Sequence, residues 1–300
     1  MAIPSNPVVG TKYKFGTFYM NNTKQIRPTK PYQPDSAATG APSAGDTPKW
    51  SSGNIEFRDT DASDAYQAEW VYVGNGKYIL SYNAAVSMSW NTLDTQGYVA
   101  GQSMTIDGVL CQVGLMSGGT ASGDNGGTPA NDWDNYIGNV LALGGLPTPT
   151  ATDLDNSLVA ADYTSTHGAF WHWASIYSWM KDTYQANQAY RVIRGYTGAR
   201  YFSGNNPANA GVNYGFRPAL LILNSAPLIS EPAADGSLGN KSASFTQQYT
   251  VSEADGEIFS ILAKVDTTTV LSLSNQSAGT FPVDLSEIWG DLSLGTHTLT

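Results

Sequence analysis

The chain has 300 residues, of which only 13% are charged, and 15 basic against 25 acidic side chains give a formal net charge of −10 at pH 7. This acidic balance argues against a nucleic-acid partner, because phosphate contacts need clustered lysine and arginine. The 31 glycines and the 11% share of aromatic residues are typical of a β-rich protein with many turns and loops.

Membrane and secretion signals are missing from the sequence. No apolar run approaches the length that spans a bilayer, so we expect no membrane insertion. The first ten residues lack the basic and apolar regions of a signal peptide. Cys111 is the only cysteine, which excludes an intrachain disulfide. It lies in an apolar run that predicts a strand, so we expect a buried, unreactive thiol.

Residues 1–49 are rich in Pro, Thr and Asn and contain one stretch of alternating aromatic residues at 12–19. Five prolines fall between residues 28 and 49. This composition predicts an extended N-terminal arm without a core of its own. Such an arm is stable only when it lies on another surface, and the alternative is a disordered leader.

Residues 50–224 are predicted to form one domain. Two helices are expected, one directly after Asn131, where acidic residues suit a helix N-terminus. The other spans residues 174–188, where apolar residues recur at helical spacing. Alternating or continuous apolar runs predict strands at 69–73, 77–82, 108–113 and 219–223.

Residues 225–300 have a different sequence pattern, in which short segments of alternating apolar and polar residues are separated by turn residues. These segments are 244–251, 258–262, 270–273 and 297–300. The pattern predicts an antiparallel β-sandwich, yet the segment is shorter than the roughly 100 residues of an immunoglobulin-like domain. We therefore expect that the natural chain continues or that a partner supplies the last strand.

Few residues in the sequence suggest a metal site or a catalytic site. His167 and His172 lie in the one cluster of histidines and aromatic residues, but a zinc site would need further ligands. An aromatic core layer over a helix start is the favoured interpretation. Residues 59–64 superficially resemble a calcium loop but lack its glycine and terminal glutamate, which favours a solvated turn. No phosphate loop, nucleophile elbow or HExxH motif is present, so we expect no catalytic residue, metal or cofactor.

Residues 194–223 carry the most informative pattern of the sequence. A polar run full of Gly, Asn, Tyr and Arg passes directly into the apolar strand at 219–223. Amides and guanidinium groups need water or a partner, so the polar run is expected at a surface. Tyrosine supplies contact area at low entropic cost, and Asn, Ser and Gly supply adaptable hydrogen bonds. This pattern predicts a recognition surface carried on a rigid strand.

The segment 215–220, GFRPAL, resembles the terminal strand motif of C-type-lectin-like domains related to formylglycine-generating enzymes. The variable proteins of diversity-generating retroelements use the same fold. Segments 133–137 and 171–180 agree, so the resemblance covers about residues 50–224. It implies that Arg217 is a buried tether and that the polar residues before it contact ligand. These ligand-binding candidates are Arg194, Tyr196, Arg200, Tyr201, Asn205, Asn206, Asn209, Asn213 and Tyr214.

That enzyme's catalytic cysteine pair has no counterpart here, since the chain holds a single cysteine. Residues 225–300 are similar to immunoglobulin-like modules in structural proteins of phages that infect Gram-positive bacteria, through 224–227, 238–241 and 253–256. Together the two resemblances imply an α+β, β-rich protein. It would have an extended arm at 1–49, a C-type-lectin-like domain at 50–224 and an immunoglobulin-like β-sandwich at 225–300.

The function implied is that of a non-catalytic phage virion surface protein, made in the host cytoplasm and displayed on a fibre, tail or head appendage. It would attach to a host-surface glycan or protein, contact other virion proteins through the arm, and gain avidity as a homo-oligomer. The alternative is a capsid or tail decoration or cement protein. A secreted bacterial carbohydrate-binding or adhesive module is disfavoured by the missing signal peptide, and an enzyme ranks last.

Overall fold

The computed structural model describes residues 3–4, 6–34, 46–123, 126–138, 144–155, 165–223, 228–230, 241–252, 259–293 and 295–299. The chain divides into two compact units, Met1–Leu223 and Asn224–Thr300. Strands make up 45% of the structure and helices 10%, which confirms the prediction of a β-rich protein.

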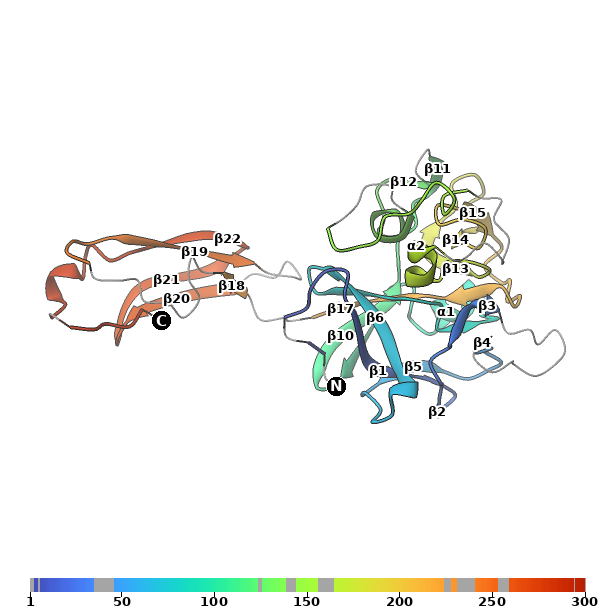
Figure 1. The fold of residues 1–300 in the computed structure, drawn as a ribbon, viewed down its shortest axis with the longest axis horizontal. Coiled ribbons are helices and arrows are strands. Elements are labelled where there is room, and N and C mark those ends of the chain that lie inside the picture. Colours follow the sequence, from blue (N-terminus) through green and yellow to red (C-terminus); the bar gives the residue numbers. More distant parts are fainter. Residues whose placement is uncertain are drawn as a thin grey trace. The chain divides into compact units, whose positions relative to one another are not determined.

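The first unit contains a curled eight-stranded sheet, in which all neighbours are antiparallel (Figure 1). Its central strand β17 carries the apolar run predicted at 219–223. Leu220 and Ile222 of this strand are buried. The order of strands is β2 (Thr23–Lys24), β1 (Lys12–Met20), β6 (Gln67–Gly74), β7 (Lys77–Leu80), β17 (Pro218–Ile222), β10 (Val109–Leu115) and β9 (Gln102–Ile106), with β5 (Ile55–Arg58) paired to β1.

Strand β1 corrects the prediction of an arm without a core. It pairs with both β5 and β6, and its Phe15 stacks on Trp70 with ring centroids 5.8 Å apart. The aromatic alternation at 12–19 therefore belongs to a core strand, because burying these rings stabilises the sheet. Further along the arm, β3 (Lys30–Pro34) and β4 (Asp46–Thr47) pair in parallel, and residues 35–45 lie outside the described residues.

A second sheet of unit 1 has the order β15 (Phe202–Asn205), β14 (Arg191–Gly195), β13 (Tyr177–Thr183), β16 (Tyr214–Phe216) and β8 (Ala85–Val86). The helix predicted across 174–188 is wrong, since this segment forms β13 instead. Trp179 packs into one hydrophobic cluster and Met180 into another, so both faces of the strand are covered. A strand buried on both faces loses its alternation, and its apolar residues can then fall at helical spacing.

The two sheets of unit 1 are joined by continuous chain at Arg217. Strand β16 belongs to the second sheet, and β17, which begins at the next residue, belongs to the curled sheet. One cluster of core residues, including Trp70, Trp179 and Leu220, draws on both sheets. A second cluster of core residues lies on the opposite faces of the two sheets. It includes three fully buried tryptophans, Trp133, Trp171 and Trp173.

Helices are short and capped by serine. Helix α1 (Trp90–Thr95) begins at Ser89, whose side chain accepts from the Thr92 amide, and α2 (Thr166–Trp171) begins in the same way at Ser165. The helix predicted after Asn131 is confirmed as a short helical segment ending in the π-helical turn η3 (Asp134–Gly138). The remaining elements of the unit are a 3-10 turn, η2 (Asp64–Tyr66), and the hairpin of β11 (Ala121–Gly123) and β12 (Gly126–Thr128).

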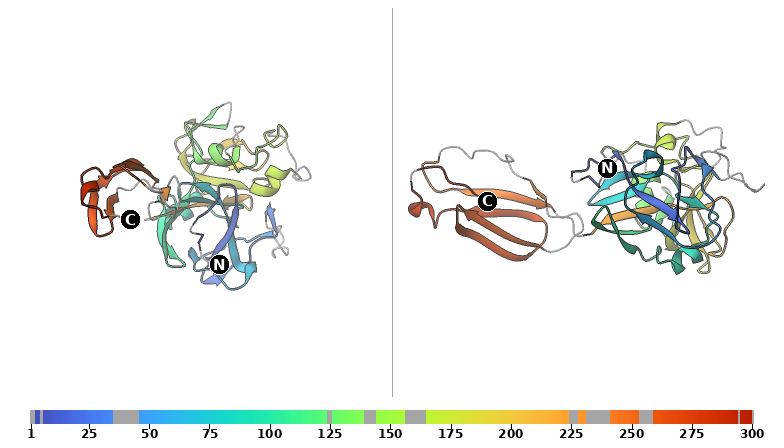
Figure 2. Two further views of the ribbon diagram at one scale, coloured as in Figure 1. Left: turned by 60° about the vertical axis from the view of Figure 1, so that its left-hand side comes forward. Right: turned by 90° about the horizontal axis from the view of Figure 1, so that it is seen from below.

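The second unit contains two antiparallel sheets, drawn in red and orange in Figure 2. They are β18 (Leu228–Ser230), β19 (Thr246–Ser252) and β22 (Gly279–Asp284), and β20 (Phe259–Val265) with β21 (Thr268–Gln276). Buried residues of both sheets, Val265 and Val283 among them, share one small core, and a 3-10 turn, η5 (Trp289–Asp291), follows β22. The motifs at 224–227 and 253–256, and most of 238–241, lie outside the described residues.

Candidate functional site

Four half-buried tyrosines form a stack on the second sheet of unit 1. The Tyr196 ring lies on Tyr177, with centroids 4.2 Å apart and planes 19° apart. Tyr177 lies in turn on Tyr214 at 5.2 Å and 23°, and Tyr214 on Trp179 at 5.3 Å and 26°. Tyr201 leans on Tyr177 at 5.7 Å and 45°. We call Tyr177, Tyr196, Tyr201 and Tyr214 the tyrosine stack. Its innermost ring, that of Tyr214, rests on Trp179, which is fully buried.

Strand register places these rings together. Tyr177 on β13 and Tyr214 on β16 are direct partners in a parallel pair, so their side chains leave the same face of the sheet. Trp179 lies two residues after Tyr177 and therefore also on that face. Tyr196 follows the end of β14, and Tyr201 precedes β15. The stack therefore combines two rigid strands with the loop that connects two others.

The backbone of Tyr196 adopts a φ of 85°, a left-handed conformation that bulky side chains rarely take. Its amide donates to the Trp173 carbonyl at 2.8 Å, and its carbonyl accepts from the Ser175 amide at 2.9 Å. These two bonds hold the unfavourable φ and place the ring against Tyr177. Conformational strain of this kind is concentrated at functional sites, and here it serves the position of one aromatic side chain.

The tyrosines of the stack influence one another electrostatically and by hydrogen bonding. Burial raises the pKa of Tyr177, and the nearby Tyr201, Tyr196 and Tyr214 hydroxyls raise it further. Burial also raises the pKa of Tyr214, again with contributions from Tyr201 and Tyr196. Tyr177 and Tyr201 are hydrogen-bonded to each other, and Asn205 Nδ2 donates to the Tyr214 hydroxyl.

Arg194 corrects the predicted set of ligand-binding residues. Its side chain is 0% exposed and forms an ion pair with Asp134. It also donates from Nη1 to the Gly118 carbonyl at 2.7 Å and from Nε to the Tyr201 carbonyl at 2.9 Å. Burial lowers the pKa of the guanidinium, and Asp134 opposes that shift. Arg194 is thus an internal tether that carries the backbone of Tyr201, and the prediction that it contacts ligand is wrong.

The structure brings several other predicted residues together. Tyr196, Tyr201 and Tyr214 belong to the stack, and Asn205 contacts it directly. The loop after Asn205 is ordered by its own side chains, because Asn206 Oδ1 accepts from the Ala208 amide and Asn209 Oδ1 from the Gly211 amide.

Two further predicted residues hold the edges of this surface. The Asn213 carbonyl accepts from the Tyr177 amide at 2.8 Å, which fixes the loop end against β13. Arg200 is half-buried and donates from Nε to the Leu154 carbonyl at 3.0 Å. Tyr177 itself was missed by the sequence analysis, because its segment was assigned to a helix. The alternation of Tyr177 and Trp179 in YSWMK is the signal that could have found it.

Arg217 is the buried tether that the sequence predicted. It is 0% exposed, and Nη1 donates to the Trp171 carbonyl at 2.5 Å and the Leu80 carbonyl at 3.3 Å. Nη2 donates to the His172 carbonyl at 2.8 Å. Burial lowers the pKa of the guanidinium to about 9. Two of these carbonyls end helix α2, where the helix dipole favours a cation.

The histidine cluster is a core layer, as predicted. His167 is buried, with Nε2 2.8 Å from the Ile137 carbonyl, and Trp173 Nε1 donates to its Nδ1 at 3.1 Å. This pair of bonds fixes a neutral tautomer. Burial lowers the pKa of His167 to about 4 and that of His172 to about 3. Within the described ranges, no three His, Cys, Asp or Glu side chains are grouped to hold a metal ion.

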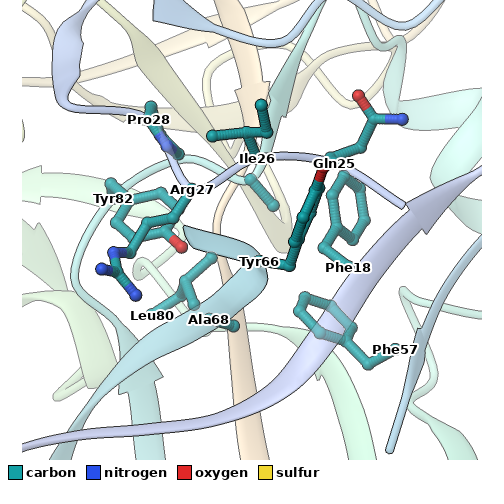
Figure 3. Close-up of a pocket in the computed structure, with 11 residues that line it drawn as sticks. Phe18, Gln25, Ile26, Arg27, Pro28, Phe57, Tyr66, Ala68, Leu80 and Tyr82 are labelled. Atoms are coloured by element: carbon teal, nitrogen blue, oxygen red, sulfur yellow. The ribbon is translucent and has the colours of Figure 1, made fainter. Parts of the chain in front are cut away.

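A small hollow elsewhere in unit 1 lies under the segment 25–28 (Figure 3). Its lining is mostly apolar and includes Phe18, Phe57 and Tyr66, and it shares no residue with the tyrosine stack. Arg27 is the one charged lining residue, and its guanidinium is already bonded to Asp64 at 2.6 Å. The hollow therefore offers no convergent polar groups of the kind that orient a ligand.

Cys111 is buried, which confirms that part of the prediction, and burial raises the pKa of its thiol to about 12. In the described part of the chain, no helix has the length and apolar character needed to cross a bilayer.

No family model, curated protein or solved structure matches this sequence or fold.

Proposed function

We propose that this chain is a non-catalytic recognition protein of a phage virion, which attaches the particle to its host through the tyrosine stack and the adjoining loop 205–213. The observation that carries the proposal is the stack itself, a group of four half-buried tyrosines in which Tyr214 rests on the buried Trp179. A tyrosine needs few fixed torsions to present a large amphipathic surface, so such a cluster binds at low entropic cost.

The strain at Tyr196 supports a binding role over simple packing. A left-handed φ would be less costly with glycine, and the side chain there is only half-buried. The Tyr196 ring is thus only partly covered by the chain, while its backbone conformation imposes a cost on the loop. A contact of the exposed part of this ring with a binding partner would account for both features.

The fold supports the same proposal in its details. Unit 1 links two sheets through a buried arginine directly after the candidate surface, which is the arrangement expected for a C-type-lectin-like domain. Unit 2, with two antiparallel sheets around one core, fits an immunoglobulin-like module. We propose that the protein is made in the host cytoplasm, assembles with other virion proteins and with copies of itself, and is displayed on the particle. Many copies would convert weak single contacts into firm attachment.

The experiment is a competition assay in which purified protein blocks adsorption of the phage to host cells. The triple variant that removes three groups of the surface carries Tyr201→Ala, Asn206→Ala and Tyr214→Ala. We expect wild-type protein to compete and the variant to lose this effect, while circular dichroism shows that the fold persists. A matched control alters three exposed serines of unit 2 through Ser260→Ala, Ser272→Ala and Ser274→Ala, and should compete like wild type.

A folded triple variant that competes as well as wild type would overturn the proposed surface. If particles that lack the protein also lose physical stability but adsorb normally, the protein is a decoration or cement protein instead.

A further inference from the structure

The rings of the tyrosine stack cover one another's faces. Tyr177 lies between Tyr196 and Tyr214, and Tyr214 lies between Tyr177 and Trp179. Both faces of these two central rings are therefore occupied within the protein. A ligand reaches Tyr177 and Tyr214 only at their edges and hydroxyl groups. This differs from an aromatic platform, on which a sugar or base lies flat against an open ring face.

The hydroxyls retain hydrogen-bonding capacity after their internal contacts are counted. A tyrosine hydroxyl donates one hydrogen bond and accepts up to two. The Tyr214 hydroxyl accepts from Asn205 Nδ2, which leaves its own proton to donate. In the bonded pair of Tyr177 and Tyr201, one hydroxyl donates to the other, so one proton and several lone pairs remain. Each group of the surface can thus both donate and accept.

The amide side chains beside the stack add to this pattern. Asn206 and Asn209 use their oxygens for amides of their own loop, and no described residue accepts from their Nδ2 groups. Asn206 is exposed, and Asn209 is half-buried. The surface beside the stack therefore supplies further uncharged donors.

The arginines around the stack are engaged by the protein itself. Arg194 is fully buried and paired with Asp134, and Arg200 is anchored through Nε on the Leu154 carbonyl. Arg191 lies over the Trp90 ring at 4.5 Å and donates to the Gln188 and Tyr190 carbonyls. Burial raises the pKa of Tyr177 and of Tyr214, which keeps these two phenols neutral at pH 7, and the chain as a whole is acidic. Each of these three arginines already contacts the protein, which disfavours an arginine fork of the kind that binds carboxylate or phosphate best.

We propose that the tyrosine stack binds an uncharged glycan through the hydroxyl edges of Tyr177, Tyr201 and Tyr214, an inference that rests on the function proposed above. Vicinal sugar hydroxyls also donate and accept, so they complement a row of phenols and amides. Protein interfaces are more often centred on an aromatic or arginine anchor that is fully desolvated in a pocket. The central rings cannot supply that anchor, because their faces are covered.

The test replaces phenols by phenyl rings, which keeps the stack and removes only the hydroxyls. The variant Tyr201→Phe/Tyr214→Phe is displayed in multiple copies on beads and compared with wild type. The probes are neutral hexose and N-acetylhexosamine oligosaccharides, with uronic-acid and sulfated oligosaccharides beside them. We expect wild type to bind a neutral probe and the double variant to bind it at least tenfold more weakly. Tyr190→Phe, which alters a half-buried tyrosine outside the stack, is the matched control and should bind like wild type.

Three results would overturn the inference, and they differ in what they say of the proposed function. Undiminished binding by the Phe variant, with binding lost in the Ala triple variant, would show that ring surfaces carry recognition. Preference for the acidic probes would show that the ligand is charged. Competition for host cells without binding to any oligosaccharide would identify a protein ligand. In each of these cases the proposed attachment function stands, whereas failure of wild type to compete would remove both.

Discussion

The Arg217 guanidinium donates a 2.5 Å hydrogen bond to the Trp171 carbonyl. Arg217 is also the residue at which the chain passes from one sheet of unit 1 to the other. The same side chain reaches the Leu80 and His172 carbonyls, so one buried cation joins β7, the end of α2 and the start of β17. The stack residue Tyr214 lies three positions before this anchor. The rigidity of the candidate surface therefore depends on Arg217.

Replacing Arg217 by lysine should lower the free energy of unfolding by about 3 kcal/mol. An ammonium group keeps the charge but cannot span three carbonyls with the planar fork of a guanidinium, so buried acceptors are left unsatisfied. Urea unfolding of Arg217→Lys measures the change. A loss below about 1 kcal/mol would show that the three carbonyls are satisfied without the guanidinium.

The buried ion pair between Arg194 and Asp134 should behave non-additively. Asp134→Leu leaves a buried, uncompensated guanidinium and should cost about 3–5 kcal/mol, whereas Asp134→Leu combined with Arg194→Met should cost clearly less. A double-mutant cycle built on chemical denaturation measures the coupling. If the double variant is as unstable as the sum of the single variants, the two side chains do not act as a pair.

Stability should fall as the pH is lowered from about 6.5 to about 4. The pKa of His167 is lowered to about 4 and that of His172 to about 3, so the unfolded chain binds protons in this range while the folded chain does not. Proton uptake on unfolding favours the unfolded state. Thermal unfolding between pH 7 and pH 4 measures the trend, and His167→Gln, which keeps a neutral hydrogen-bonding side chain, should flatten it. Stability that stays constant or rises through this window would contradict the neutral, buried tautomer.

Tyr196→Gly should separate binding from stability. Glycine relieves the left-handed φ of 85°, which offsets the lost stacking on Tyr177, so the free energy of unfolding should change by less than about 1 kcal/mol. Competition for host cells should nevertheless weaken, because the outermost ring of the stack is gone. A destabilisation above about 2 kcal/mol would identify Tyr196 as a packing residue.

Local pattern predicted the strands well and the site in part. The strands at 69–73, 77–82 and 108–113 were found because each has an alternating or continuous apolar run with turn residues at its ends. The segment 174–188 was misassigned because Trp179 and Met180 face two different cores, a fact that lies in tertiary structure. The strand at 12–19 was placed in an arm because prolines downstream dominated the composition.

The candidate site, too, could be predicted only where local sequence pattern reveals the position of a side chain. Tyr201, Asn205 and Tyr214 were identified from a polar run that could not bury itself. Arg194, in the same run, is buried because its partner Asp134 comes from a distant turn, and no local signal in the sequence reveals that pairing. Tyr177 joins the stack through strand register alone.

Hydroxyl-radical footprinting of the purified protein, with and without host cell envelopes, reports directly whether the tyrosine stack is the contact surface. Tyr196, Tyr201 and Tyr214 should be protected from oxidation on binding, while Tyr190 in the same unit should react unchanged. Equal oxidation of the stack in both samples, with protection at other residues, would show that the protein attaches through a different surface.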